Sequence, residues 1–78
     1  MKHIDMPPIQ QRIMTLLSDG YVHDIKQLIG CIDEQATVQN VRKNIFKLRE
    51  ILRRETHLDV VAYNGHGYRL VQTLSIEE

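Results

Sequence analysis

Residues 37–54 read TVQNVRKNIFKLREILRR, a stretch with a clear helical hydrophobic period. At about 100° per residue, its apolar side chains gather on one side of a helix, as in a face packed on a core. These side chains are Val38, Val41, Ile45, Leu48 and Leu52. Lys43 and Arg54 project directly away from this face. The stretch therefore predicts an amphipathic helix with a cationic outer side.

Amide and basic side chains crowd the polar side of this helix. Six of the ten lysine and arginine residues lie within it: Arg42, Lys43, Lys47, Arg49, Arg53 and Arg54. Such side chains match the donors and acceptors that base edges present in the major groove of DNA. The helix alone leaves two interpretations open, a DNA probe or an ordinary solvated face.

The composition limits the class of protein. Seventy-eight residues allow one domain, which we place at residues 1–78 with its core at about 9–74 and short tails. Zero net charge argues against a polyanionic partner, although the positive charge is concentrated in one helix. Cys31, the single cysteine, excludes an internal disulfide and favours a reducing compartment. Because no signal peptide or membrane span is evident, we expect a cytoplasmic protein without a membrane partner.

The first half of the chain predicts two more helices. Pro7 and Pro8 suit a helix start, and residues 18–20, Ser-Asp-Gly, suit its end. Residues 21–23 form a short extended piece, after which Asp24 can cap a second helix that stops before Gly30. A polar connection over residues 31–36 leads to Thr37, a candidate cap for the third helix.

The C-terminal part changes to a β pattern. Two β-prone runs flank Asn64, Gly65, His66 and Gly67, a four-residue connection typical of a hairpin, and the second run extends to Leu74. The element order is that of an α+β winged helix-turn-helix domain, in which residues 60–73 form the wing. The alternative is a helical bundle with an unstructured tail.

Two motifs strengthen this interpretation. NVRKNIFKLREIL, residues 40–52, and YNGHGYRLV, residues 63–71, resemble the recognition helix and the wing of the OmpR/PhoB-type effector domain. The resemblance implies binding of double-stranded DNA, with helix 37–54 in the major groove and the wing at the minor groove or its phosphates. Unlike in that family, we expect neither a receiver domain nor an N-terminal sheet before the first helix.

Candidate DNA contacts follow from the helix and from the resemblance. We expect base contacts from Gln39, Asn40, Lys43, Asn44 and Lys47, of which Asn40, Asn44 and Lys47 match family positions that face DNA. Phosphate contacts are expected from Arg42, Arg53, Arg54, Arg69 and His66. The resemblance implies that Arg69 binds phosphate or supports the wing. Asn64 is also a candidate DNA contact, although it replaces a residue that is often basic in the family. One such helix reads few base pairs, so two copies on DNA are expected.

Two residues of the helix have competing interpretations. Arg49 lies near the edge of the apolar face, where a structural pair with a carboxylate is favoured over a phosphate contact. Phe46 projects near the exposed side. Its ordinary role would be to pack beneath the wing or against the second helix. The functional alternative is contact with a thymine methyl group or with a protein partner.

The sequence favours a small DNA-binding transcription regulator of the kind found in phages and mobile elements. The alternative is a protein-interaction module, an adaptor or inhibitor built on the same fold, which zero net charge and a non-basic wing favour. We expect no enzyme, because no catalytic constellation is suggested by spacing. Histidine and cysteine spacings match no usual zinc pattern, so we expect neither a metal nor a cofactor.

Overall fold

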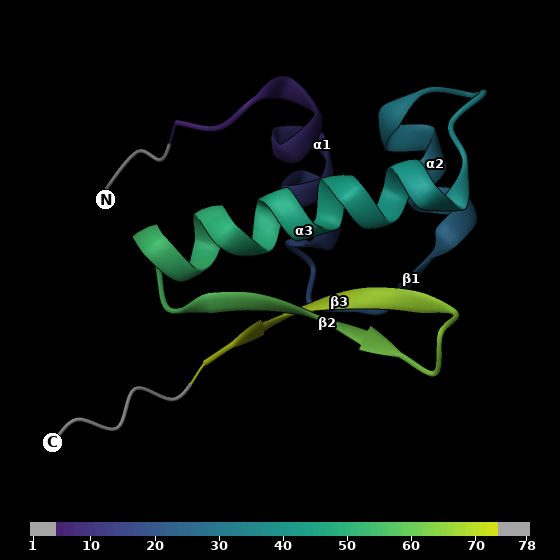
Figure 1. The fold of residues 1–78 in the computed structure, drawn as a ribbon. Helices are drawn as coiled ribbons and strands as arrows, with labels where there is room; N and C mark the ends of the chain where they lie inside the picture. Colours follow the sequence, from purple (N-terminus) through teal and green to yellow (C-terminus); the bar gives the residue numbers. More distant parts are fainter. Residues whose placement is uncertain (1–4, 74–78) are drawn as a thin grey trace, which may run out of the picture.

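Three helices precede a C-terminal β-hairpin in the computed structural model, which describes residues 5–73 (Figure 1). Its elements are α1 (Pro8–Leu17), β1 (His23–Asp24), α2 (Ile25–Ile32), α3 (Val38–Glu55), β2 (Leu58–Tyr63) and β3 (Gly67–Gln72). The short strand β1 joins the hairpin in a three-stranded antiparallel sheet of order β1-β3-β2. This arrangement confirms the expected α+β class and a winged-helix-like topology. Leu74, expected at the end of the hairpin, lies outside the described residues.

The helix starts are set by local side chains, as expected. Pro7 and Pro8 begin α1, where a missing N–H is tolerated. The Asp24 carboxylate accepts the Gln27 N–H at 2.9 Å and caps α2. Thr37 Oγ1 accepts the Asn40 N–H at 3.2 Å and caps α3. Both caps are reciprocal boxes, because the side chain of the third helical residue also accepts the N–H of the cap residue.

Three expected boundaries were wrong. The short strand lies at His23–Asp24 and not at residues 21–23, because pairing with β3 involves only those two residues. The second helix continues past Gly30 to Ile32, and it ends where Asp33 N–H bonds to Ile29 O at 3.0 Å. The hairpin connection has three residues, since Gly67 pairs with Tyr63 and belongs to β3.

The hairpin turn depends on two residues with positive φ. Asn64 and Gly65 have φ values of 50° and 70°, a region open to glycine and tolerated by asparagine. His66 N–H closes the turn on Tyr63 O at 2.9 Å. Asn64 and Gly65 therefore form the hairpin turn that the sequence predicts.

The core is an apolar cluster in which α3 contributes half of the buried side chains. Its members are Ile13, Leu17, Leu28, Val41, Ile45, Leu48, Leu52 and Val60. Val38 was also expected there, but it is 44% exposed. The helical angle of Val38 fits the stripe, yet it is the first residue of α3 and the buried stripe begins only at Val41.

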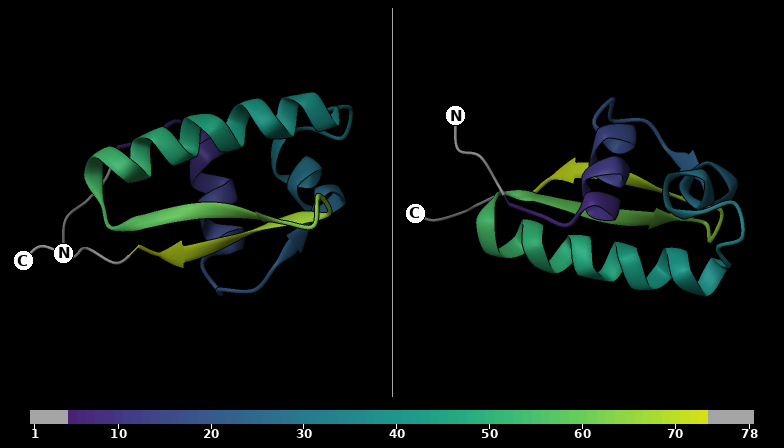
Figure 2. Two further views of the ribbon diagram at one scale, coloured as in Figure 1. Left: turned by 60° about the horizontal axis from the view of Figure 1, so that its bottom comes forward. Right: turned by 90° about the horizontal axis from the view of Figure 1, so that it is seen from above.

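The helices and the sheet leave one long side of α3 open to solvent. α1 and α2 lie behind α3, and the hairpin runs along its lower side (Figures 1 and 2). No helix among residues 5–73 is both long and apolar enough to cross a membrane.

Candidate nucleic-acid interface

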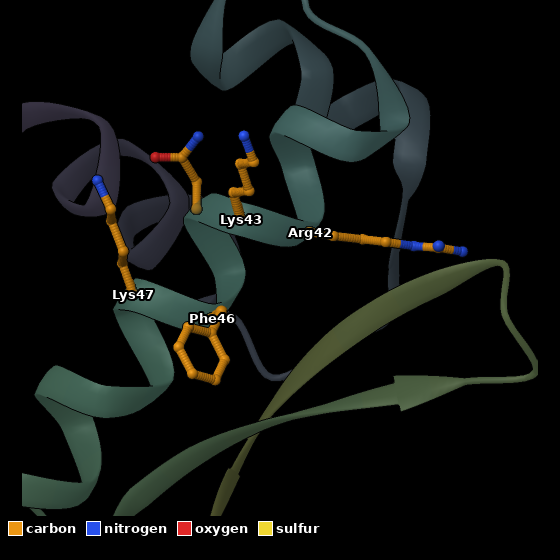
Figure 3. Close-up of a pocket in the computed structure, with 5 residues that line it drawn as sticks. Arg42, Lys43, Phe46 and Lys47 are labelled. Carbon is orange, nitrogen blue, oxygen red and sulfur yellow. The ribbon is translucent and has the colours of Figure 1, made fainter.

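The first half of α3 carries an exposed group of basic residues around an aromatic ring. Arg42, Lys43, Phe46 and Lys47 are exposed and, with half-buried Asn44, line an open depression of about 430 Å³. In Figure 3, Arg42 points toward the end of the hairpin, whereas Lys43 and Lys47 extend on the side away from it. Phe46 lies between these two groups. We call Arg42, Lys43 and Lys47 the basic cluster.

The six basic residues of α3 divide by position along the helix. No ion pair involves the basic cluster within the described residues. In the second half of α3, Arg53 lies 3.4 Å from an Asp59 oxygen, and Arg54 lies 3.7 Å from a Glu55 oxygen. Exposed Glu50 stands between the basic cluster and Arg54 on the helix. The positive charge left without a nearby carboxylate is therefore concentrated in the first half.

Arg49 has the structural role that the sequence favoured. Its Nε donates to Asp59 Oδ1 at 3.1 Å, which joins α3 to β2. Partial burial would raise the pKa of Asp59. The hydrogen bonds from Arg49 and Val60 N–H, with the charges of Arg49 and Arg53, outweigh burial and hold the pKa below its usual value.

Two expected base readers are engaged inside the domain. Asn40 Oδ1 accepts the Thr37 N–H at 2.9 Å as part of the helix cap. Asn44 Nδ2 donates to Asn40 O at 2.8 Å, and Asn44 Oδ1 accepts from Gln10 Nε2 at 2.7 Å. Of the expected base readers, Gln39, Lys43 and Lys47 have exposed side chains.

Gln10 was not singled out from the sequence, although it is only 2% exposed. Its side chain crosses from α1 to α3 and uses one Nε2 group for both Asn44 Oδ1 and Asn44 O. A signal was present, because Gln10 is three residues before Ile13 and seven before Leu17, the spacing of one helix face. A buried amide at such a position needs a polar partner, and Asn44 supplies it.

The ordinary interpretation of Phe46, packing beneath the wing or against the second helix, does not hold. Its residue surface is 60% exposed. The neighbouring positions Ile45 and Leu48 fill the core, so the ring of Phe46 is directed away from it. An aromatic side chain is thus presented to solvent within the basic cluster.

The wing is attached to the rest of the domain by its arginine. Arg69 Nε donates to Gly20 O at 2.8 Å, and its Nη1 lies 3.4 Å from the Tyr63 hydroxyl oxygen. At the turn, His66 O accepts the Ile25 N–H of α2 at 3.2 Å. The side chains of Asn64 and His66 are exposed at the tip. Arg69 therefore supports the wing from within the domain.

A second internal network, not anticipated from the sequence, braces the loop before β1. His23 is buried, with Nε2 2.9 Å from Asp19 Oδ1 and Nδ1 3.1 Å from Gln27 Oε1. The Tyr21 N–H and the His23 ring both bind the Asp19 carboxylate and lower its pKa. The loop is thereby held against the start of α2.

No group of three or more His, Cys, Asp or Glu side chains within residues 5–73 is placed to hold a metal ion. Cys31 is half-buried, and this burial raises the pKa of its thiol despite the opposing charge of Arg12. A raised pKa leaves less of the nucleophilic thiolate at neutral pH.

A scan against protein-family models, a search of curated proteins and a search of solved structures each found no match to this chain.

Proposed function

We propose that the protein binds duplex DNA in a sequence-specific manner and regulates transcription, with α3 in the major groove. One observation carries the proposal: the basic cluster lies without carboxylate partners in the described residues on the open side of α3, with Arg42 pointing toward the hairpin. A helix anchored by its opposite face can enter the groove, and cations flanking it can neutralise phosphates.

The contacts are divided by side-chain chemistry. Lys43 and Lys47 donate only, which suits the O6 and N7 acceptors of guanine, whereas the amide of Gln39 suits adenine. Arg42 points toward the hairpin and is assigned to the phosphate backbone (Figure 3). Asn40 and Asn44 are assigned to positioning α3 within the domain. This assignment differs from the sequence expectation because their side-chain oxygens are already hydrogen bonded.

The wing has a secondary role in this proposal. Asn64 and His66 are the exposed side chains of its turn, and they are assigned to the neighbouring phosphates or minor groove. The likeness to OmpR/PhoB-type effector domains rests on the two sequence motifs and on the order of elements. Since one reading helix covers few base pairs, binding as two copies on adjacent or symmetric half-sites is part of the proposal.

The test is selection from a random pool of duplex DNA, followed by titration of the best duplex at several salt concentrations. The three cations of the basic cluster, placed in the groove and at its phosphates, predict that log K falls against log salt with a slope no steeper than about −3. Lys43→Ala with Lys47→Ala removes two charges from the basic cluster and should abolish selective binding. Arg53→Ala with Arg54→Ala removes the same net charge from the half that faces carboxylates and is the matched control.

Binding lost in the first pair and kept in the second supports the proposal. Equal losses in both pairs would show that only net charge matters, which contradicts the assignment of α3 to base reading. Absence of any selectable duplex would contradict DNA binding altogether. Circular dichroism of each variant checks that it is folded.

A protein-interaction module is the second candidate. The favouring observations are exposed Glu50, which interrupts the cationic side of α3, and the 60% exposure of Phe46. An acidic, apolar segment of another protein would fit such a surface. This candidate gains support if no duplex is selected.

A further inference from the structure

We infer that Phe46 reads a thymine methyl group in the major groove, so that the DNA site contains thymine beside the bases contacted by Lys43 and Lys47. The inference rests on the proposed DNA binding and adds the base that the aromatic ring selects.

The position of Phe46 beside the basic cluster suggests a function for its exposed ring. Single exposed apolar side chains are common and need no function by themselves. Phe46, however, is 60% exposed on a helix whose buried stripe fixes its orientation, and it lines the same depression as the basic cluster. A ligand that covers the ring must therefore present an apolar group with acceptor or anionic groups close around it.

Thymine fits this description better than any other base. It carries an apolar C5-methyl group next to the O4 acceptor on its major-groove edge, and the groove is bordered by phosphates. Lys43 is three residues before Phe46 and Lys47 directly follows it, and both side chains extend on the side of Phe46 that lies away from the hairpin (Figure 3). They can reach O4 or a neighbouring guanine while the ring covers the methyl group.

The shape of the surface favours a groove in DNA over a peptide segment as the occupant. The basic cluster and Phe46 project from one turn after another of a single helix, and the depression between them is open. A protruding helix face enters a groove, whereas a bound peptide segment is usually received in one. A peptide is kept as an outcome of the test.

The experiment removes the methyl group without changing the base pairing. In the best selected duplex, each thymine is replaced in turn by deoxyuridine, which lacks only the C5-methyl group, and binding is followed by fluorescence anisotropy at constant salt. At one position the replacement should weaken binding about fourfold, the value expected for loss of one buried methyl group.

Variants assign this effect to Phe46. Phe46→Ala should bind the thymine duplex more weakly and should no longer distinguish it from the deoxyuridine duplex, while Phe46→Leu keeps an apolar contact and part of the discrimination. Tyr21→Ala is the matched control, since Tyr21 is an exposed aromatic residue on the loop before β1. It should keep both affinity and discrimination.

The outcomes separate this inference from the proposal beneath it. If duplexes are selected but no single deoxyuridine weakens binding by twofold, or if Phe46→Ala discriminates like the parent protein, the thymine assignment is wrong while DNA binding stands. If no duplex is selected, both are wrong. An acidic peptide that displaces the selected duplex from the parent protein and from Phe46→Ala equally well would leave Phe46 without a part in peptide binding. Displacement lost in Phe46→Ala would overturn the thymine assignment.

Discussion

Arg49 Nε donates to Asp59 Oδ1 at 3.1 Å, and the same oxygen accepts the Val60 N–H at 2.7 Å. One carboxylate oxygen thus joins α3 to β2, the first strand of the hairpin, and binds a backbone group of that strand. Asp59 has 13% of its side chain exposed, so water competes little for these bonds. This contact links α3 directly to β2.

The same carboxylate protects an edge of the sheet. The Thr73 N–H bonds to His57 O, so His57 directs its backbone groups toward β3. In an antiparallel pair every second residue does so, and the N–H groups of Leu58 and Val60 therefore point away from β3. Thr56 Oγ1 accepts the first at 2.9 Å, and Asp59 accepts the second. Side chains thereby occupy donors through which an edge strand could pair with another chain.

Replacing Asp59 by Asn should weaken the fall of the unfolding free energy as the pH becomes acidic. The folded-state pKa of Asp59 lies below its usual value. Its charge therefore stabilises the fold above the unfolded pKa of about 3.9, and this contribution is lost as pH falls through the folded pKa. Asn keeps acceptor geometry but not the charge, so Asp59→Asn should lose about 1 kcal/mol at neutral pH and little at low pH. Urea unfolding across this pH range measures the difference.

Glu50→Gln is the control for that experiment, because Glu50 is an exposed carboxylate on the same helix. Glu50→Gln should leave the unfolding free energy at acid pH with the same pH dependence as in the parent protein. A parent-like pH dependence in Asp59→Asn would contradict the stabilising role assigned to the Asp59 charge.

Gly67 and Gly30 should respond to alanine in opposite directions. A Cβ on Gly67 would overlap the carbonyl oxygen of His23, where β1 and β3 pair. Gly67→Ala should therefore separate these strands and destabilise the domain by about 2 kcal/mol or more. Gly30 lies within α2 with open space around it, so Gly30→Ala should stabilise the domain by about 0.5–1 kcal/mol. Thermal unfolding compares the two, and destabilisation by both would contradict the assigned helix end.

Asn44→Ala should reduce stability more than it reduces DNA affinity. Removing the amide leaves Gln10 Nε2 buried without its 2.7 Å acceptor, a loss of about 1–3 kcal/mol. Lys43→Ala, one residue earlier and exposed, should leave the unfolding free energy within about 0.5 kcal/mol of the parent value. Urea unfolding of both variants, with DNA titration where the protein is folded, separates positioning from base reading. An unchanged midpoint in Asn44→Ala would exclude the positioning role.

Local rules account for what could be predicted. Residues close together in the sequence set the hydrophobic period of α3, the caps at Asp24 and Thr37, and the Asn64-Gly65 turn. The element order then follows, because these signals separate the elements.

Contacts between distant residues account for what could not be predicted. A helical wheel places Asn44 on the flank of α3 whether it meets water or Gln10, thirty-four residues away. It also cannot show that Asp59 would draw Arg49 and Arg53 away from a ligand while no carboxylate pairs with the basic cluster in the described chain. The division of the candidate site along α3 is therefore a tertiary property.

Adjacent residues on α3 test the orientation of the helix most directly. Ile45 is 3% exposed and Phe46 is 60% exposed. Ile45→Asp places an unpaired charge in the core and should cost about 4 kcal/mol or more, enough to unfold a domain of this size. Phe46→Asp adds the same charge on the open side and should melt cooperatively near the parent temperature by far-UV circular dichroism. Because the two changes differ by one position, a folded Ile45→Asp beside an unfolded Phe46→Asp would reverse the face of α3 assigned to DNA.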